Sequence, residues 1–325
     1  MSGIIRLIAL ASVILFSTHA NAQYPNKQYP NKPVRLLVPF PAGAGVDAVA
    51  RLLAQQLTTS LGQPIIVDNR AGADGAIATE VAINAVPDGY TVLLGISGPI
   101  TDIAMLRKNP PYDAMNGLTP LGLVGRFPYF VIVHPDVPAN NIAQLVAHAR
   151  ANPGKLSNGT GNANALLLTT IFSKAAGMNL VNVPYKGDAV AIVDLVAGRI
   201  NMMLIGTTNP ALGLAREGKL RALATLLQTR SVLAPDVPTM AESGYPTVTT
   251  TGWLAMFAPA KLPSDITTRL SRTISEALRR PDMREALGQH AFEISTSTSE
   301  ELAVLMKQHA ARMKSVYAEV GFEPQ

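Results

Sequence analysis

Short apolar runs alternate with amphipathic segments along the chain, and this alternation constrains the fold more than any other feature. Near the N-terminus, the apolar runs 34–40, 64–69 and 87–95 predict strands, and residues 47–62 predict a helix with apolar positions at helical spacing. Gly62 is a suitable stop for that helix. Strands that alternate with helices are typical of largely parallel sheets covered by helices. The sequence therefore predicts an α/β protein.

The same alternation resumes beyond residue 125. We expect strands or helices in the ranges 127–135, 142–151, 156–177, 180–187, 188–199, 200–206, 211–219, 220–226 and 251–259. Two long amphipathic helices are predicted at 263–292 and 299–321. Asn141 is expected to cap the helix that follows it, and Ser299 to begin the last helix.

The order of these elements predicts two lobes. Residues 23–125 together with 240–325 would form the first lobe, and residues 126–239 the second. Each lobe would hold a mainly parallel sheet flanked by helices. Because the chain would cross between the lobes twice, we expect a hinged pair with a cleft between them.

The first 22 residues have the features of a secretory signal peptide. Arg6 gives a positive start, residues 7–16 are apolar, and Ala20-Asn21-Ala22 matches a small-residue cleavage signal. The apolar run is short for a membrane span, which needs about 20 residues. We predict cleavage after Ala22 and a periplasmic mature protein; an uncleaved N-terminal anchor is the alternative.

Composition excludes several classes of function. The chain has no cysteine, so it can hold neither a disulfide nor a thiolate metal site. Its basic residues are scattered and do not form runs interleaved with aromatic residues, so nucleic acid is not an expected partner. The mature histidines His134, His148, His290 and His309 lack metal-ligand spacing, and no metal is expected.

The segment VPFPAGAGVDAVAR, residues 38–51, contains a glycine turn that leads from a strand into a helix. Gly43 to Ala48 fit the G-x-G-x-x-G/A pattern of dinucleotide-binding folds, with Asp68 further along. However, Pro39 and Pro41 make the turn a stiff elbow, and turn chemistry explains Asp68 equally well. We expect no cofactor; an NAD-dependent enzyme is the less favoured alternative.

Such a loop can instead bind an anion. The start of a helix exposes free N–H groups and a partial positive charge, and glycine allows a ligand to approach the backbone. A second loop of this kind occurs at SNGTGNAN, residues 157–164, in the second predicted lobe. The two loops could hold one ligand from both sides. The alternative is that the glycines only form turns and that Asp47 only caps its helix.

Several stretches together resemble the periplasmic receptors of the tripartite tricarboxylate transporters, the Bug family. They are PFPAGAGVDAVAR, NRAGADGAIATEVAINAVPDGYTVLLG, NPGKLSNGTGN, VPYKGDAVAIVDLVAGRI, GKLRALA, APDVPTMAESGYP and GWLAMFAPAKLP, in that order. The resemblance implies a two-lobed periplasmic-binding-protein fold, type II-like, without enzyme activity. It also implies capture of a small organic acid and delivery to a membrane permease, or alternatively to a sensor kinase, by a monomer.

The resemblance also implies which residues bind the ligand. The first loop would contribute Phe40, Ala42, Gly43, Ala44, Gly45 and Asp47. The second loop would contribute Thr160, Gly161, Asn162 and Asn164. The adjacent turn Tyr185, Lys186 and Gly187, and the closing loop with Gly206 and Thr207, would complete the pocket. We expect a bulky residue at Gly43 or Gly161 to weaken binding and leave the fold intact.

Three departures from the family pattern bear on the ligand. Ala44 separates the glycines of the first loop, and Val46 takes a position that is commonly polar. The second loop is about two residues short, and Leu166–Leu168 replace a frequent histidine. Gly206 and Thr207 stand where an acid is common, which argues against an amino-acid ligand. A mono-, di- or tricarboxylate, also one with an aromatic body, fits better.

Other polar residues have a structural alternative. We expect Arg51 and Arg70 to brace loops and Trp253 to pack in the core. Lys186 could pair with a carboxylate or be solvated, and Tyr185 could contact ligand or pack in the core. Asp102 and Asp113 are expected to be solvated in loops, and His309 to lie on a solvated helix.

Overall fold

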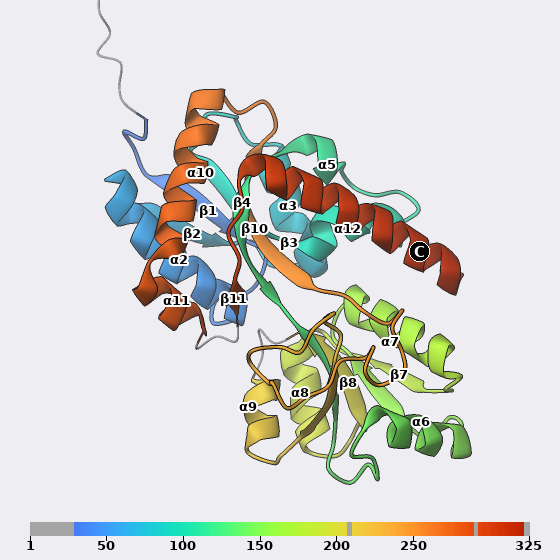
Figure 1. The fold of residues 1–325 in the computed structure, drawn as a ribbon. Coiled ribbons are helices and arrows are strands. Elements are labelled where there is room, and N and C mark those ends of the chain that lie inside the picture. The colour runs from blue at the N-terminus through green and yellow to red at the C-terminus, as the bar shows by residue number, and fades with distance from the viewer. Residues whose placement is uncertain (1–28, 207–209, 289–291, 322–325) are drawn as a thin grey trace, which may run out of the picture.

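The computed structural model describes residues 29–206, 210–288 and 292–321, arranged as two α/β lobes (Figure 1). The predicted signal peptide, residues 1–22, lies outside the described residues. The strands are β1 Val34–Val38, β2 Ile65–Asn69, β3 Thr91–Ile96, β4 Leu118–Phe127, β5 Tyr129–Val133, β6 Ser157–Thr160, β7 Val181–Pro184, β8 Met202–Gly206, β9 Arg221–Thr225, β10 Gly252–Pro259 and β11 Glu293–Ile294.

The helices cover both sheets. They are α2 Gly45–Leu61, α3 Ala76–Ile83, α4 Ile103–Leu106, α5 Ala114–Gly117, α6 Ile142–Ala151, α7 Ala163–Ala176, α8 Asp188–Val196, α9 Ala211–Arg216, α10 Ser264–Arg279, α11 Pro281–Gly288 and α12 Ser299–Val320. Two short turns of helix, η1 Ala73–Gly75 and η2 Gly98–Asp102, precede α3 and α4. Among the described residues, no helix is both long and apolar enough to span a bilayer.

Each lobe is built on one mixed sheet. The sheet of lobe 1 has the order β11-β4-β10-β3-β1-β2, and the sheet of lobe 2 has the order β7-β6-β8-β5-β9. β1 pairs in parallel with β2 and β3, and β6 pairs in parallel with β7 and β8. β10 and β11 in lobe 1 and β5 in lobe 2 run against their neighbours. Most strands of each sheet therefore point one way, as predicted.

The chain crosses between the lobes on extended segments. β4 of lobe 1 continues through Pro128 into β5 of lobe 2, and β10 enters lobe 1 after the return crossing. In both sheets, the strand that follows a crossing is antiparallel to its partners. The residue boundaries predicted for the lobes stay a prediction.

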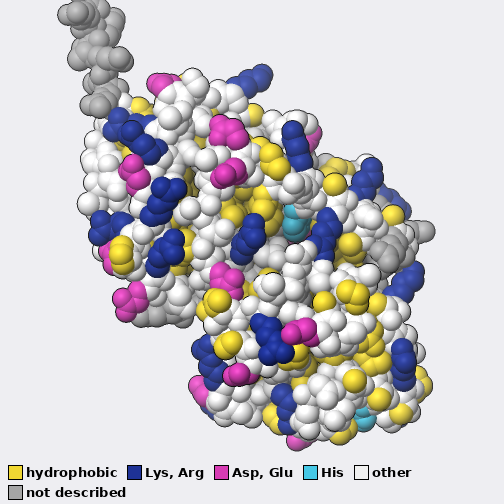
Figure 2. Space-filling model, viewed as in Figure 1, with side chains coloured by type: hydrophobic (Ala, Val, Ile, Leu, Met, Phe, Trp, Pro, Cys, Tyr) yellow, Lys and Arg dark blue, Asp and Glu magenta, His cyan; other side chains and the backbone are white. Residues whose placement is uncertain are grey.

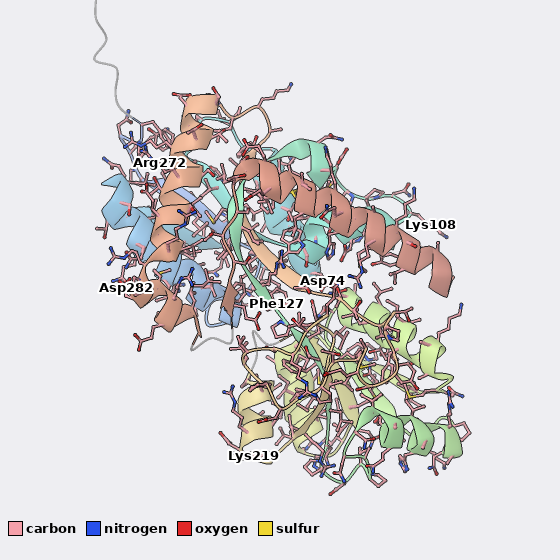
Figure 3. All side chains as sticks on the ribbon, viewed as in Figure 1. Asp74, Lys108, Phe127, Lys219, Arg272 and Asp282 are labelled. Carbon is pink, nitrogen blue, oxygen red and sulfur yellow. The ribbon has the colours of Figure 1, made fainter. Side chains whose placement is uncertain are left out.

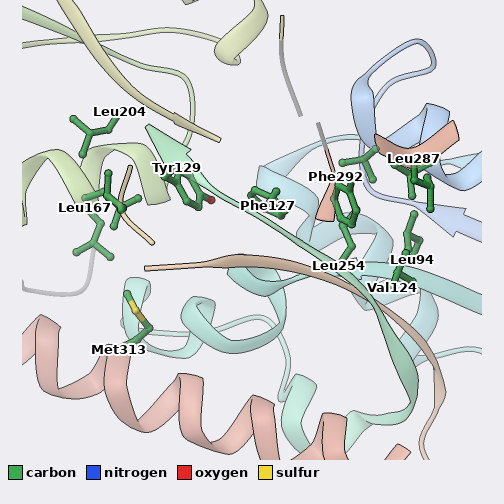
Figure 4. Packing of buried hydrophobic residues seen from close by; sticks show 14 of the residues in the cluster. Leu94, Val124, Phe127, Tyr129, Leu167, Leu204, Leu254, Leu287, Phe292 and Met313 are labelled. Atoms are coloured by element: carbon green, nitrogen blue, oxygen red, sulfur yellow. The ribbon is translucent and has the colours of Figure 1, made fainter. Parts of the chain in front are cut away.

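One apolar core runs through the crossing. It includes Leu94 and Leu254 of lobe 1, Leu167 and Leu204 of lobe 2, and Phe127 beside them at the crossing (Figure 4). The rings of Phe127 and Tyr129 lie 5.5 Å apart, centre to centre. Two further clusters fill the other face of each sheet. The crossing is therefore a packed joint.

Most predicted elements are present, and the differences have local causes. The predicted helix 263–292 is two helices, because the chain leaves helical geometry at Arg280 and restarts at Pro281. The last helix begins at Ser299, as predicted, and Thr298 caps it. Asn141 caps α6 as predicted, and its side chain accepts a bond from the Gln144 N–H. β4 was not predicted at all.

Candidate functional site

The two glycine loops lie at equivalent places in the two sheets. The first follows β1 and the second follows β6, each at the carboxyl end of a strand with parallel neighbours on both sides. After β1, the chain forms β2 on one side of β1 and later β3 on the other side. After β6, it likewise forms β7 on one side of β6 and later β8 on the other side. Open α/β sheets bind ligands at such switch points.

Asp47 holds the first loop in shape from within. Its carboxylate is only 3% exposed, and it accepts hydrogen bonds from the Gly43 N–H, the Arg51 Nε and the Asn69 Nδ2, each at 2.9 Å. The Asn69 Nδ2 also donates to the Phe40 carbonyl at 2.9 Å. Asp47 lies in the first turn of α2, inside the helix, and does not cap it. Its carboxylate is committed to the loop backbone and its neighbours.

These contacts set the charge of Asp47. Burial opposes its ionisation, but the hydrogen bonds from Arg51, Gly43 and Asn69 outweigh burial and hold the pKa of this carboxyl below its ordinary value. Arg51 therefore braces the loop, as predicted. Arg70 follows β2, and its Nε lies 3.0 Å from the Asp68 Oδ1; that it braces a loop stays a prediction. Asp68 is thus an ion-pair partner.

Among the described residues, no side chain caps the helix start of the first loop. The N-cap residue Ala44 gives α2 no side-chain hydrogen bond. The Gly43 N–H is used by Asp47, and the Ala44 N–H donates to the Pro41 carbonyl at 3.2 Å. Gly43 has a φ of 86°, which favours glycine. Val46 is buried in the core and presents no side chain to the loop surface.

Side chains of the second loop form hydrogen bonds to neighbouring elements. Asn162 caps α7 by accepting from the Ala165 N–H at 2.9 Å, and its Nδ2 donates to both Asp188 oxygens at 3.1 Å. The Asn164 Nδ2 donates to the Tyr129 hydroxyl at 2.7 Å. The Thr160 hydroxyl donates to the Asn182 side chain at 3.0 Å. The loop is thereby attached to α8 and to the crossing strand.

Gly161 is required by close packing. A Cβ at this position would lie 2.3 Å from the Asp188 N and 2.5 Å from the Gly187 carbonyl carbon. Backbone atoms cannot yield to such a contact, so a bulky residue would displace the loop from α8. We expect this displacement to be local to the loop, so the prediction that the fold stays intact while binding weakens stays a prediction. At Gly43 a Cβ meets nothing within 4 Å, and only the positive φ resists substitution.

In the turn before α8, Tyr185 is held by protein contacts, whereas Lys186 is exposed. The Tyr185 hydroxyl donates to the Asp194 Oδ2 at 2.9 Å, and its ring packs against the lobe 2 core. Lys186 is exposed, and Gly187 has a φ of 114°. Contact of these residues with a ligand stays a prediction.

Gly206 ends β8 against the crossing. A Cβ there would lie 3.1 Å from the Phe127 ring, so glycine allows the ring to cover this position. Thr207, the other residue predicted for the closing loop, lies outside the described residues.

A third glycine loop, residues 70–75, connects the two predicted loops. Gly75 packs so closely on the proline elbow that a Cβ would lie 3.0 Å from the Pro39 Cβ. On its other side, the Asp74 carboxylate accepts a hydrogen bond from the Ala163 N–H of lobe 2 at 3.4 Å. The loops after β1 and β6 therefore lie on the same side of the molecule, at the junction of the lobes.

Sequence analysis missed several residues of this junction. Asp74 was not singled out, because an acid in a glycine-rich turn has the usual composition of a loop. Asp102 and His309 were expected to be solvated, and this is wrong: Asp102 is 1% exposed, and the His309 Nε2 lies 3.4 Å from its Oδ1. Trp253 is buried, as predicted, with its ring edge-on to His309. Asp113 caps α5.

One cavity lies beside the second loop, on α7 and the neighbouring strands. It holds about 340 Å³ and is lined by residues of α7 and of the β6 and β7 strands, among them Asn158, Leu166 and Asn182. It shares no lining residue with the predicted ligand set. On the face shown in Figure 2, acidic and basic side chains are interspersed, without a patch of one sign.

The fold and the paired loops define a class, the two-lobed periplasmic binding proteins. Residues 49–322 match the model of the tripartite tricarboxylate transporter family receptor. The chain belongs to this family.

Individual relatives agree with this assignment. Protein BugT of Bordetella pertussis is 35% identical over 97% of this chain and 98% of its own length. A Rhodopseudomonas palustris protein determined with adipate superposes with a TM-score of 0.85 at 29% identity, covering 91% of this chain and 100% of that one. MatC from Rhodopseudomonas palustris, determined with bound malate, gives a TM-score of 0.80 at 27% identity, covering 89% of this chain and 99% of that one.

Proposed function

We propose that this protein is a periplasmic receptor that captures a small organic carboxylate between its lobes and delivers it to a membrane permease. The observation that carries the proposal is the placement of two loops at strand switch points, one in each lobe, connected at the lobe junction by Asp74 and Gly75. The relatives determined with adipate and malate support a carboxylate as the ligand class.

The chemistry of the first loop fits an anion. The start of α2 has no side-chain cap, and its N-terminal N–H groups are the kind of donors that hold carboxylates. The negative charge of Asp47 is paired with Arg51, and Asn69 donates a further hydrogen bond to the same carboxylate, so repulsion of a ligand anion by Asp47 is reduced. Each exposed helix-end contact contributes about 0.3–1 kcal/mol. Micromolar binding, about −8 kcal/mol, therefore needs both loops and a shaped pocket.

Calorimetric titration of the mature protein tests the proposal. We expect at least one acid of a panel with one, two or three carboxylates, aromatic acids included, to bind with a Kd near or below the micromolar range. NAD serves as the negative control. Binding of NAD with no response to any carboxylate would refute the proposal and favour an enzyme. Uptake by a strain with and without the gene tests delivery to a permease.

A further inference from the structure

Asp74 brings a carboxylate of lobe 1 to the helix start of lobe 2. Its Oδ2 lies 3.4 Å from the backbone nitrogen of Ala163, the first residue of α7, and the residue lies where the lobes meet (Figure 3). An ionised carboxylate at this end of a helix is favoured by the free N–H groups and by the helix dipole. Asp74 thus places a negative charge at the start of α7.

Other protein groups also satisfy this helix start. The Ala165 N–H is bound by the Asn162 side chain, and the Asn162 amide in turn contacts the Asp188 carboxylate. Two acidic side chains, Asp74 and Asp188, therefore adjoin the second loop. The Asp74 carboxylate therefore makes the start of α7 an unfavourable place for a further negative charge.

We propose that Asp74 is a specificity-determining residue that selects ligands with one carboxylate and excludes a second anionic group from the start of α7. This inference rests on the proposed function and specifies its ligand class. The single carboxylate would be held at the start of α2, and the remainder of the ligand would face the second loop as a neutral group.

The backbone at Asp74 guides the choice of variants. Asp74 has a φ of 54° and Ala73 a φ of 48°, both in the left-handed region. Asparagine tolerates this region about as well as aspartate, and glycine adopts it freely. Asp74→Asn and Asp74→Gly therefore remove the charge without adding strain. Asp136→Asn is a matched control, because its side chain is 91% exposed and the charge change is the same.

The test compares two acids of equal chain length by calorimetry, hexanoate with one carboxylate and adipate with two. We expect the wild type to prefer hexanoate, and both Asp74 variants to shift the ratio of Kd values toward adipate by about tenfold, as for a partly screened charge pair. Asp136→Asn should leave the ratio unchanged.

Two results would overturn the inference. If both acids bind and the ratio shifts by less than twofold in both Asp74 variants, Asp74 does not set specificity, while the proposed function stands. If neither acid nor any other carboxylate binds the wild type or the variants, the proposed function fails and the inference fails with it.

Discussion

At the scale of single residues, the buried hydrogen bonds of Asp47 lead to a testable prediction. Asp47→Asn keeps the shape of the side chain but replaces one acceptor atom by a donor, facing donors from Gly43, Arg51 and Asn69. A buried group left unpaired costs about 1–3 kcal/mol. We expect Asp47→Asn to lower the free energy of unfolding at pH 7 by about that amount, measured by urea denaturation.

The same residue predicts a pH dependence. Because the folded-state pKa of Asp47 is lowered, its stabilisation is complete above the ordinary aspartate pKa of about 3.9 and is lost as pH falls through the folded-state value. The gap between wild type and Asp47→Asn should therefore narrow below about pH 4. A gap of equal size at pH 7 and at pH 3 would contradict this account. Asp136→Asn is the control with the same charge change.

At the scale of elements, local patterns predicted most strands and helices well. β1, α2, α6 and β10 are fixed by apolar spacing and by their ends, and they lie within a few residues of the predicted ranges. β4 was not predicted, because Pro120 and the glycines Gly122 and Gly125 interrupt its apolar pattern. The strand is held by its neighbour β10, a contact between distant parts of the chain that no local pattern reports.

In the candidate site, too, local patterns were predicted from the sequence and contacts between distant residues were not. The glycine loops were visible in the sequence, since glycine and small polar residues between a strand and a helix have a local signature. The partners of these loops were not visible. Asp74 and Ala163 are 89 positions apart, and Asn69 reaches Phe40 over 29 positions. Such contacts depend on how strands are ordered in the sheets and how the lobes meet.

The start of α12 offers a prediction at the element scale. The Thr298 hydroxyl accepts from the Glu301 N–H at 3.2 Å, and the Glu301 carboxylate accepts from the Thr298 N–H at 2.8 Å. Thr298→Ala removes the first of these bonds and should cost about 1 kcal/mol of unfolding free energy. Urea denaturation measures this loss.

A threonine inside a helix provides the comparison. The Thr268 hydroxyl of α10 is exposed and donates to the Ser264 carbonyl of its own helix. Thr268→Ala should change the unfolding free energy by less than about 0.5 kcal/mol. Equal losses in the two variants would show that the reciprocal cap does not stabilise α12.

At the scale of the whole molecule, the two lobes are connected by segments that pack closely against each other where the chain crosses between them. The Phe127 ring covers Gly252 and Gly206, and it packs against Tyr129 and against Phe292 at 6.0 Å between ring centres. A Cβ on Gly252 would lie 2.2 Å from this ring. The two crossing segments are therefore fitted to each other by one aromatic side chain and one missing Cβ.

This fit predicts a coupling that a double-mutant cycle can measure. Gly252→Ala forces the ring out of place and should destabilise by about 1–3 kcal/mol, as overpacking does. Phe127→Ala should cost about 3–5 kcal/mol through the lost burial. In the double variant the ring that obstructs the new methyl group is gone, so the combined loss should be smaller than the sum by about 1 kcal/mol or more.

Urea denaturation of the four proteins gives the coupling energy. Gly213→Ala in α9, where a Cβ meets nothing within 4 Å, is the control partner and should combine additively with Phe127→Ala. If Gly252→Ala also combines additively, the contact between the Phe127 ring and Gly252 does not stabilise the crossing between the lobes. A positive coupling instead means that the fit of the Phe127 ring against Gly252 stabilises the crossing between the lobes.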